Sequence, residues 1–194
     1  MGMLILGLVL FLGVHSTRIV AEGWRTAMIG RLGEKRWKGL YALVSLVGFG
    51  LVVWGFGLAR QQPVQWWAPP FATRHLAWLL TALAFILLAA AYVPRNAIKA
   101  RLHHPMVLGV MCWAVAHLLA NGNRAHVLLF GSFLVWAGLS FRSARARDRA
   151  ALAVYPAGTA GTAAGTLMAV LAGMAAWAVF AFWAHGLLIG IRPV

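Results

Sequence analysis

Apolar residues recur along this chain in long runs, separated by short segments rich in arginine, lysine, glycine and proline. A helix needs about 20 apolar residues to cross a hydrocarbon core of about 30 Å. Six runs approach that length, at residues 3–20, 39–59, 71–93, 106–120, 127–141 and 167–191. The fourth and fifth runs are short and close together, which predicts a tight helical hairpin. The pattern therefore predicts an all-α fold, a polytopic integral membrane helix bundle of about six transmembrane helices, in a single domain over residues 1–194.

The longest polar segment, residues 21–38, follows the first run. Trp24, Ile29 and Leu32 alternate with its charged residues. An amphipathic pattern of this kind is typical of a short helix that lies on the membrane surface. A solvated loop is the alternative interpretation of the same segment.

Composition supports a membrane protein, because 62% of the residues are hydrophobic and only 10% are charged. The formal net charge is +14, which by itself could indicate a nucleic-acid-binding protein. The distribution of the charge argues against that interpretation. Thirteen of the 17 basic residues lie in the segments 18–38, 95–101 and 142–149, all on one side of the predicted topology. This is the positive-inside pattern, so both termini are expected to face away from the cytoplasm, and the basic segments are expected to attract anionic membrane lipid.

Two histidines inside predicted spans are the strongest candidates for a functional site. An ionisable group at hydrocarbon depth is costly and marks a site with a partner. His15 lies about 18 Å from the outer end of the first predicted helix, and His117 lies about 18 Å from the inner end of the fourth, at 1.5 Å per residue. Because these helices run in opposite directions, the two imidazoles are expected at similar depth, where they could hold a metal or a haem between them. Two separate, hydrogen-bonded structural histidines are the alternative.

Further polar residues lie near these two histidines. Arg18 shares a helix face with His15 and either extends to the membrane surface or pairs with a haem propionate or another buried anion. Trp113 and Asn121 lie four residues before and after His117, so we expect all three on one helix face.

His104 precedes Pro105 at the predicted start of the fourth helix. This donor-rich helix start could bind an anion, or it could be a topological anchor and cap. His185, near the end of the last run, is a weaker candidate ligand.

Other classes of site find little support in the chain. Its only cysteine is Cys112, which excludes an internal disulfide and a cysteine-based zinc site. The three acidic residues, Glu22, Glu34 and Asp148, all lie outside the predicted spans, so a carboxylate-based hydrolase is poorly supported.

The chain resembles the NnrU family of bacterial membrane proteins over nearly its full length. The matching stretches are residues 12–18, 33–41 with Ser45, His104-Pro105, 116–122 and the tail from His185 to Pro193. The resemblance implies a multi-pass protein of the bacterial inner membrane with a role in denitrification, the respiration of nitrite and nitric oxide.

The family is also similar to plant zeta-carotene isomerase, a membrane enzyme that contains haem b. By this resemblance His15 and His117 correspond to its haem-ligating histidines, which implies haem b as the cofactor, with iron bound by these two residues. The isomerase has a cysteine three residues before the second ligand, whereas this chain has Ala114 there. The resemblance therefore carries haem binding to this chain but not a cysteine-linked ligand exchange.

These observations lead to one expectation and three alternatives. We expect haem b between the first and fourth predicted transmembrane helices, with Arg18 and His104 supporting its propionates or an adjoining substrate. The alternatives are a haem-dependent isomerase of a lipophilic polyene, a membrane methyltransferase, and a cofactor-free accessory protein for membrane complexes. The methyltransferase rests on a resemblance in the Arg/His-Pro element alone. Membrane methyltransferases with this element usually carry an acidic motif downstream of it, and this chain has no acid between Glu34 and Asp148. Lipid, haem and a lipophilic small molecule are thus the expected partners, and nucleic acid is not one of them.

Overall fold

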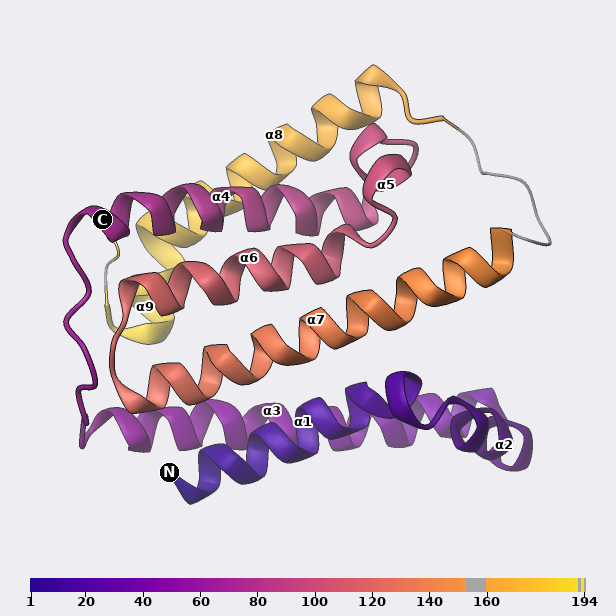
Figure 1. The fold of residues 1–194 in the computed structure, drawn as a ribbon, viewed down its shortest axis with the longest axis horizontal. Coiled ribbons are helices and arrows are strands. Elements are labelled where there is room, and N and C mark those ends of the chain that lie inside the picture. Colours follow the sequence, from indigo (N-terminus) through magenta and orange to yellow (C-terminus); the bar gives the residue numbers. More distant parts are fainter. Residues whose placement is uncertain (153–159, 192, 194) are drawn as a thin grey trace. The chain divides into compact units, whose positions relative to one another are not determined.

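The computed structural model describes residues 1–152, 160–191 and 193, and these residues form helices joined by short connections (Figure 1). The elements are α1 (Gly2–Val20), α2 (Glu22–Leu32), α3 (Glu34–Arg60), α4 (Ala72–Tyr92), α5 (Ala97–Leu102), α6 (Pro105–Ala120), α7 (Arg124–Leu152), α8 (Ala163–Val179), the π-helical turn η1 (Phe180–Ala184) and α9 (His185–Ile189). The described part of the chain contains no β-strand, only two isolated bridges. The all-α prediction is confirmed.

The predicted spans correspond to observed helices. Five helical segments of the described chain are long and apolar enough to cross a membrane, and α6, with 16 residues, is a shorter apolar helix. The polar segment after the first run also forms a helix, α2, and its position on the membrane surface stays a prediction. Helix α7 is much longer than predicted, because residues 142–152 are mostly arginine and alanine, which are strong helix formers and do not end a helix.

The chain divides into two compact units. The first contains Met1–Pro69 and Asn121–Ser140, and the second contains Pro70–Ala120 and Phe141–Val194. Helix α7 therefore contributes its first part to one unit and its last part to the other. That the whole chain forms one domain stays a prediction.

In the first unit, α1 lies along α3, and glycines let the two backbones approach closely (Figure 1). A Cβ atom placed on Gly7 would lie 2.5 Å from the backbone nitrogen of Val52, and one on Gly48 would lie 2.7 Å from that of Phe11. Gly55 faces the backbone of α1 in the same way. Small residues at such contacts are typical of membrane helices, which have no hydrophobic driving force to associate and depend on close packing.

In the second unit, α4 packs against α6 and α8. The turn after α4 is held by Asn96, whose side chain is only 1% exposed. Its amide donates to the carbonyls of Ala90 and Val93 at 2.9 and 2.6 Å, and its oxygen accepts the backbone N–H of Lys99 at 2.7 Å, which caps α5. All the polar atoms of this buried side chain are thus paired, which keeps the α4–α5 connection in one conformation.

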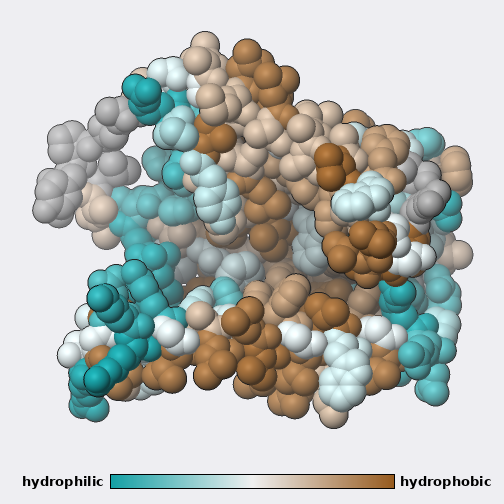
Figure 2. Space-filling model, turned by 180° about the vertical axis from the view of Figure 1, so that it is seen from behind, coloured by the Kyte–Doolittle hydropathy of each residue, from teal (hydrophilic) through white to brown (hydrophobic). Residues whose placement is uncertain are grey.

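Large apolar side chains lie on the outside of the helices. Val9, Leu46 and Leu79 are 63%, 69% and 69% exposed, respectively. In Figure 2, hydrophobic side chains cover most of the visible flanks of the helices, and hydrophilic side chains gather toward the helix ends. Such a surface is unfavourable in water and suits a lipid environment.

Candidate functional site

His15 lies in the last third of α1, surrounded by aromatic rings of the first unit. Its ring centroid is 4.3 Å from that of Phe11, 5.2 Å from that of Tyr41 in α3 and 6.0 Å from that of Trp136 in α7. Its Nδ1 lies 2.6 Å from the carbonyl oxygen of Phe11, one turn earlier. Because a carbonyl oxygen only accepts, Nδ1 carries the proton, and in the neutral ring the lone pair is on Nε2.

His117 has the same arrangement within the second unit. It lies in the last turn of α6, and its Nδ1 donates to the carbonyl oxygen of Trp113 at 2.8 Å. The Trp113 ring packs beside it, with the centroids 5.2 Å apart. The neutral ring of His117 therefore also carries its lone pair on Nε2.

A hydrogen bond from Nδ1 to a carbonyl is the usual arrangement of a metal-ligating histidine, because it fixes both the tautomer and the ring orientation. The bond alone does not single out His15 and His117. His126 makes an equivalent bond to the Asn123 side chain, and His185 makes one to the Ile191 carbonyl, each at 2.6 Å. His126 and His185 also lie in apolar helices, so the choice of His15 and His117 rests on their predicted similar depth and on the family resemblance.

Their joint role as a clamp stays a prediction. His15 belongs to the first unit and His117 to the second. The structure therefore describes the neighbours of each histidine within its own unit. Among the residues that the structure describes, no group of three or more histidine, cysteine or acidic side chains could hold a metal ion.

Arg18 lies in the last turn of α1, next to an acidic residue. Its Nε is 3.9 Å from Oε2 of Glu22, whose other oxygen accepts a hydrogen bond from Arg25 at 3.2 Å. The sequence predicted that Arg18 either extends to the membrane surface or pairs with a haem propionate or another buried anion, and it did not name Glu22 as a partner. The spacing of four residues between Arg18 and Glu22 was the signal for this additional partner.

Helix α6 ends at Ala120, which changes the expected position of Asn121. Trp113 shares a helix face with His117 as predicted, but Asn121 does not continue that face because it lies beyond the helix. It belongs to the connection in which Gly122 packs against the backbone of Trp67. Glycine is required at position 122, because a Cβ atom there would collide with the Trp67 carbonyl.

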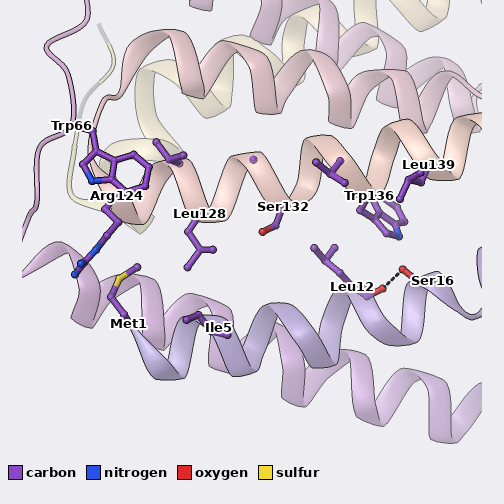
Figure 3. A pocket seen from close by; sticks show the side chains of 13 residues that line it. Met1, Ile5, Leu12, Ser16, Trp66, Arg124, Leu128, Ser132, Trp136 and Leu139 are labelled. Carbon is purple, nitrogen blue, oxygen red and sulfur yellow. Dashed lines mark hydrogen bonds between the residues drawn. The ribbon is translucent and has the colours of Figure 1, made fainter.

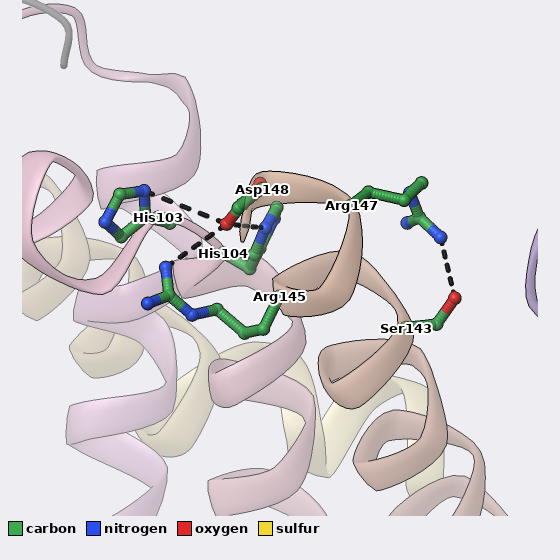
Figure 4. A network of polar contacts seen from close by, with 6 residues as sticks. All are labelled: His103, His104, Ser143, Arg145, Arg147 and Asp148. Carbon is green, nitrogen blue, oxygen red and sulfur yellow. Dashed lines mark hydrogen bonds and ion pairs between the residues drawn. The ribbon is translucent and has the colours of Figure 1, made fainter. Parts of the chain in front are cut away.

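His104 is part of a polar network around Asp148 in the second unit (Figure 4). Oδ2 of Asp148 accepts hydrogen bonds from Nε2 of His104 at 2.9 Å and from a guanidinium nitrogen of Arg145 at 3.2 Å. Nδ1 of His103 is 3.8 Å from the same oxygen. His104, considered as an anion site, thus already has a protein carboxylate, and nothing in the local sequence indicated this pairing across 44 residues.

Asp148 lies beyond the part of α7 that crosses the membrane, since about 20 residues counted from Arg124 suffice for the hydrocarbon core. Partial burial acts to raise the pKa of Asp148. The hydrogen bond from His104 and the charges of His104, His103 and Arg145 outweigh that effect and hold the pKa below its ordinary value. A carboxylate with a lowered pKa stabilises the fold at pH values above its unfolded pKa of about 3.9, and this contribution is lost as the pH falls through its folded pKa.

We therefore expect Asp148→Asn to lower the free energy of unfolding by about 1 kcal/mol near pH 7. The difference from the wild type should shrink as the pH falls below about 4, because the wild-type carboxyl group is then protonated as well. Thermal unfolding of the detergent-solubilised proteins between pH 3 and pH 7 would measure this difference in the free energy of unfolding. Glu34→Gln is the matched control, since within the described residues Glu34 pairs with the exposed Lys38 alone. A difference that does not change with pH would contradict the ionic origin.

Comparison with known proteins places the whole chain in one family. The family model described as NnrU protein matches residues 3–193. No curated protein and no solved structure matches the chain. The chain, with its five long apolar helices and nearly complete match, belongs to the NnrU family of multi-pass membrane proteins.

Proposed function

We propose that this NnrU family protein binds one haem b through His15 and His117 and has a redox or cofactor-linked role in nitrite and nitric oxide respiration at the bacterial inner membrane. The structural observation that supports the proposal is the shared tautomer of the two histidines, and the choice of these two among the four histidines with such a bond rests on the family resemblance. Each donates its Nδ1 proton to the carbonyl one turn earlier, so each offers Nε2 to a metal. The respiratory role rests on the family resemblance.

The residues present fit the chemistry of haem. Two neutral imidazoles are a common axial ligand pair for haem iron, and the aromatic rings around His15 provide an apolar environment that limits access of water. When bound, the haem would supply one-electron chemistry.

The chain's own residues would position the group. The carbonyls of Phe11 and Trp113 fix the orientation of the two rings, and the Trp113 ring packs beside His117. Arg18 is the proposed partner of a propionate, in competition with Glu22. His104 is held by Asp148, so in this proposal it supports the fold near the start of α6 more than it binds a propionate.

The purified wild-type protein tests this proposal. After expression with sufficient haem, we expect a Soret band and, in a pyridine haemochrome assay, about one haem b per chain. Expression without added haem precursor, followed by titration with haemin, should restore the same spectrum. A folded protein without Soret absorption under both conditions would contradict haem binding and favour an accessory role.

A further inference from the structure

A groove in the first unit runs between α1 and the first part of α7 (Figure 3). Its volume is about 870 Å³, which is in the range of sites for small molecules. The side chains that form its walls are apolar for the most part, among them Ile5, Leu12, Leu128, Val135 and Leu139. The groove follows α7 from Arg124 to Leu139, about 22 Å at 1.5 Å per residue, which is most of the thickness of a hydrocarbon core.

Gly131 helps to keep this groove open. It lines the groove in the middle of α7, and a Cβ atom placed on it would meet nothing within 4 Å. The space over Gly131 is therefore not occupied by protein side chains of the unit. A larger residue at this position would fill the groove without displacing the backbone of a neighbouring helix.

The two ends of the groove differ in chemistry. One end carries Arg124, which is exposed, and Trp66, and Figure 3 shows the two side chains together at this mouth. No acidic residue lines the groove, and none of the described carboxylates lies within ion-pair distance of Arg124. The other end carries Leu139, the ring of Trp136 and Ser16, whose hydroxyl donates to the Leu12 carbonyl within α1 at 2.7 Å. A positive mouth followed by an apolar channel is complementary to an amphiphile with an anionic head and a hydrocarbon chain.

We propose that this groove binds an acidic phospholipid, with its phosphate on Arg124 and Trp66 and one acyl chain along α1 and α7. Guanidinium binds phosphate through charge-assisted, often bidentate hydrogen bonds, and an indole N–H adds a donor. The apolar walls account for the chain, which a free phosphate lacks. Arg124 lies at the start of α7, on the side that the charge pattern assigns to the outer membrane surface, where a lipid headgroup is found. This inference does not depend on haem.

Native mass spectrometry of the full-length protein in detergent tests the proposal with three probes: dioleoylphosphatidylglycerol, dioleoylphosphatidylcholine, and glycerol 3-phosphate as a head without a chain. We expect phosphatidylglycerol to bind about tenfold more tightly than phosphatidylcholine, and glycerol 3-phosphate not to bind detectably. Arg124→Gln should reduce the affinity for phosphatidylglycerol about tenfold and remove the preference. Gly131→Leu should weaken both lipids, because the new side chain fills the groove.

Two matched variants serve as controls. Gly57→Leu adds the same side chain to an exposed glycine of α3, where a Cβ also meets nothing within 4 Å. Arg74→Gln removes another arginine assigned to the outer side, which lies over the Phe71 ring. Both should bind lipid as the wild type does.

Equal affinities for the two lipids, or an unchanged preference in Arg124→Gln, would overturn the proposal. Unchanged lipid binding in Gly131→Leu would do the same. Loss of a dimer in Gly131→Leu with unaltered lipid binding would show that a second copy occupies the groove instead. If Gly131→Leu failed to fold, the Arg124→Gln comparison would still decide the matter.

Discussion

Replacing either His15 or His117 by alanine is expected to abolish the spectrum of six-coordinate, low-spin haem. Each histidine offers a single nitrogen, Nε2, because Nδ1 is used by the carbonyl one turn earlier. Loss of either ring would therefore remove one of the two proposed ligands, and the variant would bind haem with one histidine or not at all. Substitutions that only affect the orientation of metal ligands commonly cost 10- to 100-fold in affinity, so removal of a ligand should weaken haem retention by at least about tenfold. Absorption spectra and haem content of the purified variants measure the effect.

Two other histidines provide the controls. His75→Ala removes an imidazole that packs on Phe71 and Trp78 at the start of α4, and it should leave the haem spectrum unchanged. His185→Ala is the informative comparison, because the Nδ1 of His185 also donates to a carbonyl. If His185→Ala abolished the low-spin spectrum while His15→Ala retained it, the first ligand would be wrongly assigned. Wild-type spectra in both His15→Ala and His117→Ala would refute the whole assignment.

Gly55→Ala is expected to lower the stability of the fold more than Asp148→Asn does. A Cβ atom at this position would overlap the backbone of α1 at Leu4. Its distance to the backbone atoms there would be shorter than real Cβ atoms show. Because backbone cannot rotate away as a side chain does, α1 and α3 would have to move apart and lose packing along their length. We expect a decrease of about 2 to 3 kcal/mol in the free energy of unfolding, the upper part of the range for overpacked cores. Thermal unfolding in detergent, followed by circular dichroism, measures it.

Gly57→Ala is the matched control in the same helix, two residues away. Gly57 is exposed and its added Cβ would meet nothing within 4 Å, so alanine should stabilise α3 by about 0.5 to 1 kcal/mol through its higher helix propensity. Opposite signs for the two substitutions would show that the α1–α3 contact, and not glycine content, is responsible. Equal effects would contradict the close approach of α1 and α3 at Gly55.

Much of the fold could be predicted because the membrane interior imposes the same requirement on each spanning segment, whatever its neighbours are. Every backbone N–H and C=O of a span must be hydrogen-bonded within its own helix. An apolar run of sufficient length therefore predicts a helix even when the segments that pack against it are unknown. The helix α2 was predictable for a different reason, the alternation of apolar and charged residues along its segment. The extension of α7 past residue 141 was not predicted, since the hydrophobic pattern ends there although the helix does not.

The candidate site was predictable only in part. His15, His117, Arg18 and His104 were found because charged or ionisable groups are rare near the apolar runs of this chain. Their partners were found only where the spacing along one helix shows them, as with Trp113 and His117. Tyr41 and Trp136, which pack on His15, lie far away in the sequence, and so does Asp148, which binds His104.

The sequence by itself determined that this is a membrane protein of the NnrU type, where its helices lie and which histidines are candidates for ligands. These properties follow from local composition, since the transfer of a segment into hydrocarbon depends on its own residues. The tertiary structure alone decided which glycines carry helix contacts, which acid pairs with His104, and that an open groove with Arg124 at its mouth lies between α1 and α7. Such features depend on residues distant in the chain that approach within a few ångströms, and no pattern along one segment specifies that approach.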